Sequence, residues 1–235
     1  MSHNRRTTGS LLVSRTASAL VELSLTAAAG DHLGAEADLL KRLDVSRPTL
    51  RQAAKIVESD RMITVRRGTN GGFFAARPDA SDVIRAPARY LRLQGATIAD
   101  VHAVTKLIAE GVVVAAAFSV DTGLRERVAD FRDRIDGNDT VSNLIHAETE
   151  LARLLAMMSG NPAAQLFIEI GYTFGRDDRQ LHFYQTAADR ERARTLQRAL
   201  CDAVLARDPE VGRLMMQRRS AMIGEWLVRE GAAAA

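Results

Sequence analysis

The sequence predicts a mainly α-helical protein with two domains: an N-terminal winged helix-turn-helix, made of three helices and a β-hairpin, and a C-terminal antiparallel helical bundle. Between residues 33 and 76, two short helical patterns precede two strand-like segments that a glycine-rich turn separates. Beyond residue 82, almost every segment is long, rich in Ala and Leu and helically periodic, without strand alternation or an internal repeat. Pro and short polar residues at 77–82 mark a boundary, so we expect domains at residues 1–78 and 79–235.

Two helices are expected before the turn of the motif. One spans about residues 12–29, ends at Gly30-Asp31, and carries an apolar stripe of Ala17, Val21 and Leu25. The other spans residues 33–43 and turns three leucines inward, Leu39, Leu40 and Leu43. Both patterns follow the three- and four-residue spacing of one helix face.

The next helix is the most informative segment of the chain. Ser46 is a suitable N-cap, and Pro48 falls in the first turn, where a backbone N–H is not needed. One face carries the apolar residues Leu50, Ala53, Ala54 and Val57, and another carries the cations Arg47, Arg51 and Lys55. A helix with an apolar back and a cationic front fits the major groove of DNA, and the phosphates attract it. The same pattern describes an amphipathic helix with solvated charges, so the flanking segments decide between the two interpretations.

The segment after this helix predicts a β-hairpin with a basic tip. In residues 62–67, the apolar residues Ile63 and Val65 alternate with polar ones, as in a strand with one buried face. Residues 68–72 form a turn rich in residues that accept positive φ, and a second strand is expected at 73–76. Helix, turn, helix and basic hairpin together indicate a winged helix-turn-helix.

Two stretches of this region carry a family resemblance: "VSRPTLRQA" at residues 45–53 and "RRGTNGGFF" at residues 66–74. In this order and at this separation they resemble the DNA-binding domain of GntR-type bacterial transcriptional regulators. The Gly-Gly wing and the long helical remainder are most similar to the FadR subfamily. The resemblance implies DNA contacts from the recognition helix and the wing, through Ser46, Arg47, Thr49, Arg51, Arg67 and Gly68. The family often has arginine where this chain has Ala37, so one contact is absent, and Gln52 is placed to read adenine in compensation.

Charge is unevenly divided between the two expected domains. Residues 1–78 hold twelve Lys and Arg against seven Asp and Glu, a net charge of +5, whereas residues 79–235 have a net charge of −2. The positive charge therefore belongs to the part that carries the DNA-binding motif.

Cysteine usage and hydropathy indicate a cytoplasmic protein, and the resemblance implies a bacterial one that is associated with the nucleoid when it is bound to DNA. Cys201 is the only cysteine, which excludes an intramolecular disulfide and fits a reducing compartment. No apolar run reaches the roughly 18 residues of a membrane span, and no signal peptide follows the N-terminal arginines. We expect no association with membranes.

The second domain is expected to contain six long helices, at about residues 101–119, 124–135, 142–158, 163–174, 190–206 and 208–228. Residues 106–117, "SGNP" at 159–162 and "LQRALCDAVLARDPEVGRLMMQRRSAM" at 196–222 resemble parts of the effector domain of the FadR subfamily. The resemblance therefore spans nearly the whole chain, more loosely in its second half.

Many members of this subfamily hold a divalent metal with one Asp and three His inside the bundle. The resemblance places these four positions at Glu148, Ala152, Gln197 and Arg219. A single carboxylate facing an arginine cannot supply the donors that a transition metal requires, so we expect neither a metal nor another cofactor. Arg219 has two interpretations. It is a surface or salt-bridged side chain, or it fills a persisting effector cavity and pairs with an acidic ligand.

The sequence thus predicts a ligand-responsive transcriptional regulator, a repressor that binds a palindromic double-stranded DNA operator as a homodimer. The effector is expected to be a small organic anion, because Arg219 would attract a carboxylate or a phosphate. An effector-independent, nucleoid-type DNA-binding protein is the alternative, although it has little need of such a large helical domain. An enzyme is not expected, because Cys201 has no evident His partner and the glycine-rich turn lacks the Gly-Lys-Ser/Thr ending of a phosphate loop. Four aromatic residues of the second domain have two interpretations, as core residues or as the wall of a ligand cavity: Tyr172, Phe174, Phe183 and Tyr184.

Overall fold

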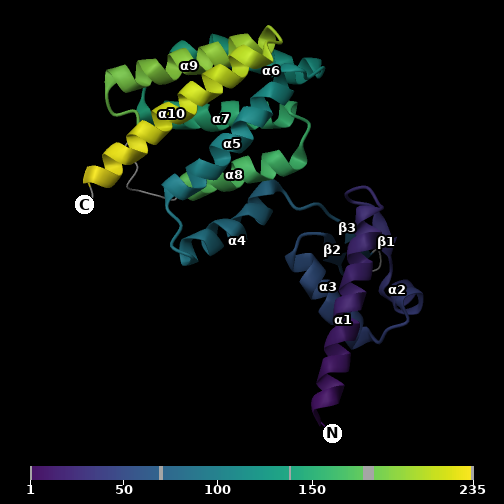
Figure 1. Cartoon of the computed structure of the whole chain (residues 1–235). Coiled ribbons are helices and arrows are strands. Elements are labelled where there is room, and N and C mark those ends of the chain that lie inside the picture. Colours follow the sequence, from purple (N-terminus) through teal and green to yellow (C-terminus); the bar gives the residue numbers. More distant parts are fainter. Residues whose placement is uncertain (1, 69–70, 138, 177–182, 234–235) are drawn as a thin grey trace. The chain divides into compact units, whose positions relative to one another are not determined.

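The computed structural model describes residues 2–68, 71–137, 139–176 and 183–233, and their side chains except at residues 2–9, 80–81 and 230–233. The chain divides into two compact units, residues 1–83 and residues 84–235. The division falls within a helix, α4 (Ala80–Leu93), rather than in an irregular linker. Figure 1 shows the elements of each unit.

Unit 1 contains three helices and a small sheet: α1 (Ser2–Leu25), β1 (His32–Gly34), α2 (Glu36–Leu43), α3 (Arg47–Ser59), β2 (Ile63–Arg66) and β3 (Gly72–Ala75). Its core joins α1 to α3 through buried Leu20, Leu39, Leu50 and Val57. α1 and α3 pack directly against each other, so the apolar face of α3 is covered and its opposite face is left to solvent.

The first helix differs from the sequence prediction in its bounds and its buried face. It begins at Ser2 and ends at Leu25, whereas residues 12–29 were expected. Leu25 is 55% exposed, and the stripe that packs inward consists of Ala17, Leu20 and Ser24. Ser24 belongs to this face because its hydroxyl donates to the carbonyl of Met62 across the unit at 2.5 Å, which satisfies a buried polar group.

The segment 33–43 is only partly helical. α2 occupies Glu36–Leu43, and Leu39 is fully buried as expected. The residues before it form β1, which pairs antiparallel with β3 and gives the sheet the order β1-β3-β2. The strand was missed because three residues are too short to show an alternating pattern.

The turn between α2 and α3 uses a left-handed residue. Asp44 has φ 49° and ψ 54°, a conformation that Asp tolerates better than most residues. Ser46 then caps α3, with its Oγ accepting from the backbone N–H of Thr49 at 3.4 Å, and Pro48 lies in the first turn. These features confirm the predicted start of the recognition helix.

The wing depends on two consecutive glycines. β2 pairs with β3 in the register Ile63↔Ala75 to Arg66↔Gly72. A Cβ on Gly71 would lie 2.5 Å from the carbonyl oxygen of Arg66. A Cβ on Gly72, whose φ is 149°, would collide with the ring of His32. No other residue fits at either position without moving the backbone.

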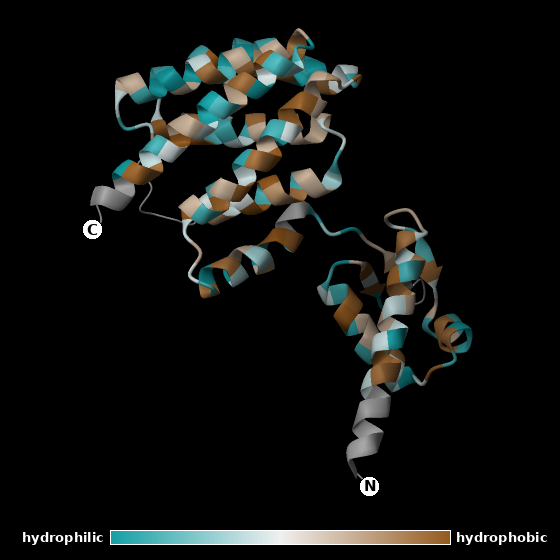
Figure 2. Ribbon diagram, in the orientation of Figure 1, coloured by the Kyte–Doolittle hydropathy of each residue, from teal (hydrophilic) through white to brown (hydrophobic). Residues whose placement is uncertain are grey.

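Unit 2 consists of α-helices and one 3-10 turn within the described ranges. After α4 these are α5 (Ile98–Ala117), α6 (Thr122–Asp133), η1 (Ile135–Gly137), α7 (Val141–Met158), α8 (Pro162–Arg176), α9 (Ala187–Leu205) and α10 (Pro209–Ala233). The six helices expected from the sequence are present with bounds shifted by a few residues, whereas α4 was not expected and contains Pro87. Hydrophobic and hydrophilic residues alternate around these helices, as Figure 2 shows.

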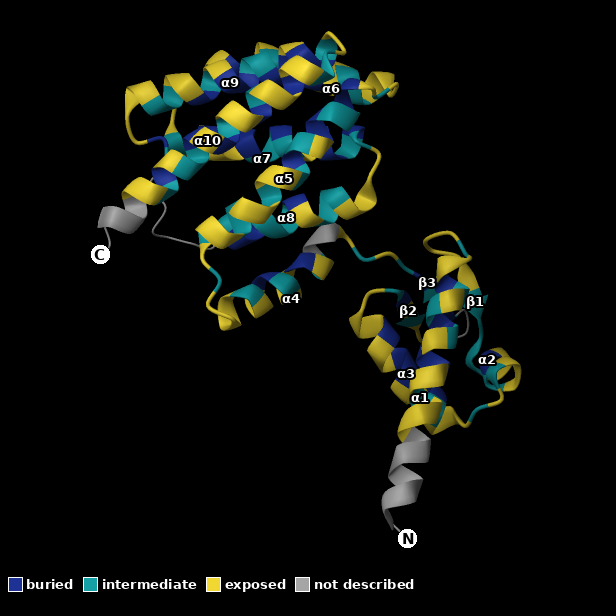
Figure 3. Cartoon of the chain, viewed as in Figure 1, coloured by how far each residue is buried: buried dark blue, intermediate teal, exposed yellow. Residues whose placement is uncertain are grey.

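α5 is the central helix of unit 2. It packs against α7, α8 and α10, and the Val- and Ala-rich end of the helix, residues 112–117, is largely buried. Val113 faces Gly212 near the start of α10, and His102 contacts Ser220 further along, so α5 and α10 run antiparallel. Buried residues gather along α5 and α7 (Figure 3), including Val113, Leu151 and Leu154.

None of the described helices is by itself long and apolar enough to cross a bilayer. The pair α5 and α6, bent by 113° at its break, reaches that length and composition only when the two are taken together.

The packing of α3 on α1 predicts a large loss of stability when a buried leucine is truncated. Leu50 is completely buried, so Leu50→Ala should lower the free energy of unfolding of unit 1 by about 2–5 kcal/mol. Leu11→Ala, on the exposed side of α1, is the control and should change it by less than about 0.5 kcal/mol. Urea denaturation followed by circular dichroism measures both, and equal losses would contradict the packing described.

Candidate functional site

The outer face of α3 is open to solvent and cationic. Ser46, Arg47, Arg51 and Gln52 are exposed and Thr49 is half-buried, while Leu50, Ala53 and Val57 point into the core. The side chains of Arg47 and Arg51 are 64% and 66% exposed, respectively. The structure therefore brings the five predicted residues of this helix to one surface, near its N-terminal end. Helix-turn-helix proteins contact base edges from this end of the recognition helix.

A carboxylate on α2 joins the two arginines. Glu36 Oε1 lies 3.3 Å from Nε of Arg47 and accepts a hydrogen bond from Nε of Arg51 at 3.2 Å. Glu36 stands at the first turn of α2, where a helix favours negative charge. Because Glu36 engages Nε, the two terminal nitrogens of each guanidinium remain available for a guanine edge or a phosphate. The sequence prediction did not include Glu36, since nothing in the spacing of the two segments shows which carboxylate the arginines meet.

The wing supplies further cations beside the sheet. Arg67 and Gly68, both predicted, are exposed, and Gly68 has φ 106°. Arg66 was not predicted as a site residue, yet its guanidinium lies 4.2 Å from the ring centroid of Phe74, which fixes the direction of the side chain. Residues 69 and 70 of the tip lie outside the described residues.

Unit 2 encloses a cavity of about 480 Å³ between α5, α7, α8 and α10. This volume falls in the roughly 300–1,000 Å³ of small-molecule sites. Most of the lining is apolar, for example Val112, Leu155, Ile168 and Met216. Glu148, Ala152 and Arg219, three of the four predicted pocket residues, contribute to its surface.

A buried ion pair forms the polar part of the cavity wall. Arg219 donates to Glu148 through Nε at 2.7 Å and through Nη2, and the two side chains are only 12% and 5% exposed. Gln197, the fourth predicted residue, lies behind the pair and donates to Glu148 Oε1 at 2.9 Å. Its own Oε1 has no partner among the described residues. Arg219 is thus a salt-bridged residue and a cavity residue at once, and the free cation on which an anionic effector was expected is neutralised.

No group of three or more His, Cys, Asp or Glu side chains within the described residues is arranged to hold a metal ion. Opposite Glu148, the wall presents a guanidinium rather than further donors, so these residues do not fit a transition metal.

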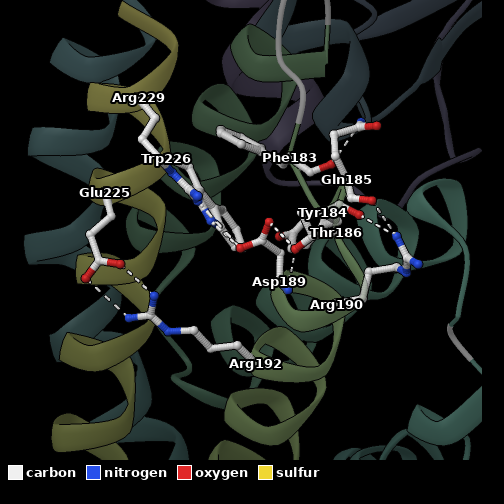
Figure 4. Close-up of polar contacts among 10 residues, drawn as sticks. All are labelled: Phe183, Tyr184, Gln185, Thr186, Asp189, Arg190, Arg192, Glu225, Trp226 and Arg229. Carbon is white, nitrogen blue, oxygen red and sulfur yellow. Dashed lines mark hydrogen bonds and ion pairs between the residues drawn. The ribbon is translucent and has the colours of Figure 1, made fainter. Parts of the chain in front are cut away.

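Aromatic residues close one side of the cavity. Tyr172, Phe183 and Tyr184 line it, whereas Phe174 instead stacks under Arg92 of α4. The Tyr184 ring meets Trp226 of α10 edge-on, with centroids 4.9 Å apart. Figure 4 shows Trp226 held in turn by a hydrogen bond from its Nε1 to Asp189, 3.1 Å long, at the start of α9. The cavity-wall interpretation therefore holds for three of the four aromatic residues.

The protonation states of nearby groups follow from burial. Burial raises the pKa of the Tyr172 and Tyr184 hydroxyls, so both remain neutral donors. Burial lowers the pKa of His102, which therefore stays neutral at pH 7. Burial also raises the pKa of the Cys201 thiol to about 12, which keeps it an unreactive part of the core.

Together these features define a winged helix-turn-helix protein with a second, helical unit that contains a cavity. No family model matches the sequence. The uncharacterized HTH-type transcriptional regulator YcbG of Bacillus subtilis is 28% identical over 211 residues, which cover 88% of this chain and 84% of that protein.

The architecture is shared with a solved structure. Streptococcus agalactiae GntR has a TM-score of 0.66 at 17% sequence identity, covering 90% of this chain and 98% of that one. A GntR family member from Pseudomonas syringae pv. tomato has a TM-score of 0.42 at 14% identity, covering 97% and 89% of the two chains. The likeness to the streptococcal protein shows that this chain shares its fold.

The Glu36 contacts predict a change in DNA selectivity. Glu36→Gln should release both arginines, so affinity for random duplex should rise while the ratio of operator to random affinity falls about three- to tenfold, or roughly 1 kcal/mol. Fluorescence anisotropy with an operator selected from a random library measures both affinities.

Asp38→Asn is a matched control for this variant. It makes the same change of charge on the exposed side of α2, but Asp38 has no contact with either arginine in the structure. Its selectivity ratio should stay at the wild-type value, and an equal fall in both variants would reduce the role of Glu36 to general electrostatics.

Proposed function

We propose that the protein is a GntR-type transcriptional regulator, acting as a repressor at the bacterial chromosome in the cytoplasm. In this proposal it binds a palindromic operator as a homodimer and responds to a small organic molecule that enters the cavity of unit 2. The observation that carries the proposal is the exposed cationic face of α3 beside a basic wing, within a fold shared with a GntR protein.

DNA recognition is assigned to α3 and the wing. Arg47 and Arg51 would contact base edges or phosphates in the major groove, and Ser46, Thr49 and Gln52 would bond beside them. Arg67 and Gly68 would meet the backbone flanking this groove, together with Arg66. The exposure of these residues supports the assignment, because a major-groove contact requires side chains free of the protein core.

A homodimer is supported by apolar surface on unit 2. Val104 and Leu107 of α5 are 56% and 67% exposed, and Leu214 of the antiparallel neighbour α10 is 44% exposed. Gly111 of α5 is also exposed, and a Cβ there would meet no atom within 4 Å, so a second helix has room to approach. A two-fold symmetric pair would bury this patch and present two recognition helices to two half-sites.

The effector role of unit 2 is supported by the cavity. A protein that only coats DNA has no use for a cavity of this volume with a polar cluster in its wall. Sequencing of the chromosomal DNA that the protein binds distinguishes the regulator from the nucleoid-type alternative. Few sharp sites with an inverted repeat support the regulator, and broad coverage without sequence preference supports the nucleoid-type alternative.

Arg51 should carry sequence specificity. Arg51→Ala is expected to weaken operator binding by about 1–3 kcal/mol, with a much smaller loss on random duplex, because a bidentate contact to guanine is lost. Arg213→Ala, an exposed cation at the start of α10, is the charge-matched control and should leave both affinities unchanged. Equal losses on both DNAs would make Arg51 a phosphate contact.

Leu107 should be part of the dimer interface. Leu107→Glu places a charge in the apolar patch and is expected to shift the protein from dimer to monomer at micromolar concentration, measured by light scattering. Leu93→Glu, at an 83% exposed position on α4, should remain dimeric. A monomeric wild-type protein, or a dimeric Leu107→Glu variant with native circular dichroism, would rule out this interface.

A further inference from the structure

The charges in the cavity wall cancel one another. Glu148 is neutralised by Arg219, with both side chains almost fully buried. Arg153, which also lines the cavity, is paired with Glu169, to which its Nη2 donates at 2.8 Å. His102 uses Nε2 to donate to the carbonyl of Ser220 at 3.0 Å in its neutral form, which leaves Nδ1 as an acceptor.

A charged ligand would have to break this balance. An anion that takes Arg219 from Glu148 leaves a buried carboxylate without its partner, and an ammonium group that takes Glu148 leaves a buried guanidinium. Uncompensated buried charge is strongly unfavourable, so the ion pair selects against both kinds of ligand. Lys106 also lines the cavity, but it lies on the exposed side of α5, where water already solvates its ammonium group.

The wall nevertheless offers hydrogen bonds to a neutral group. The Tyr172 hydroxyl accepts from Arg219 Nη2 at 2.8 Å, and its own hydrogen has no acceptor in the part of the chain that the structure describes. Tyr184 lines the same cavity, and its hydroxyl likewise has no acceptor among the described residues. Two phenolic donors and the His102 acceptor suit a carbonyl, amide or hydroxyl group.

We propose that the cavity binds an uncharged amphiphile, with an apolar body among the aliphatic side chains and one amide, carbonyl or hydroxyl group bonded to Tyr172 and Tyr184. This inference rests on the proposed function only in treating the cavity as the effector site. The Glu148–Arg219 pair acts as the selectivity element, because it is neutral when intact and costly to separate.

Matched probes that differ only in charge test the ligand class. The C6, C8 and C10 members of three series (amide, primary alcohol and carboxylate) are titrated into the full chain by calorimetry and thermal shift. At one chain length or more, the amide or alcohol should bind at least about tenfold more tightly than the carboxylate. A carboxylate that binds as tightly or more tightly would overturn the proposal, as would the absence of binding by every probe.

Variants then assign the selectivity to the ion pair. Glu148→Gln leaves Arg219 without its counter-ion, so the preference should reverse in favour of the carboxylate. The double variant Glu148→Leu/Arg219→Met removes both charges and should keep the preference for the amide, even if Glu148→Gln does not fold. A double variant that gains carboxylate binding would contradict the role of the pair.

Tyr172→Phe removes one donor and should weaken amide binding about five- to tenfold, whereas Tyr90→Phe, on the exposed side of α4, should not weaken it. Equal binding by the two tyrosine variants would overturn the proposed contact. Carboxylate binding that disappears in Lys106→Met would instead place an anionic group at the mouth of the cavity and refute the neutral class.

Operator affinity in the presence of the bound amide is measured separately. An amide that binds without changing operator affinity would leave the ligand chemistry standing and refute only the effector role. A change in operator affinity would support both.

Discussion

The burial of one side of α3 is the constraint on which its exposed cationic face depends. Leu50, Ala53 and Val57 are nearly inaccessible to water because α1 and the sheet cover them. With a period of 3.6 residues, this burial orients Arg47 and Arg51 away from the core. The cap at Ser46 and the left-handed Asp44 then determine where the helix begins. The exposed cationic surface is therefore a consequence of packing on the opposite side of the helix.

The parts of the fold that repeat over several turns could be predicted from the sequence. α3 and the six long helices of unit 2 have apolar residues at helical spacing and clear terminal signals such as Ser46 and "SGNP" at 159–162. β1 could not be predicted, because three residues carry no period, and its strand character comes from pairing with β3. α4 was missed because Pro78 and the short polar residues at 77–82 were interpreted as a boundary, although the buried Ile84 and Ala88 of this helix lie one turn apart.

The spacing of residues along one helix predicted the cationic face of α3, and Arg47 and Arg51 are indeed exposed. The resemblance placed Glu148, Gln197 and Arg219 in one site, and these three side chains do lie together. Partners from distant segments were harder to predict: nothing in the sequence shows that Glu36 meets two arginines, and a salt bridge was only one of the two interpretations of Arg219. These contacts change what the residues can bind, since an arginine that is paired in the folded chain is no longer a free cation for a ligand.

Under the proposed function, the Glu36 contacts also bear on how the protein would find its operator. A regulator must leave the many wrong sites of a chromosome quickly, and its residence time on each is set by phosphate contacts that any sequence offers. The Glu36 carboxylate competes with DNA phosphates for both arginines. It would therefore shorten the time that the protein spends at non-specific sites. The protein would stay longer only at a site that also forms hydrogen bonds with the terminal guanidinium nitrogens. One acidic side chain thereby links the local geometry of two helices to the speed of the genomic search.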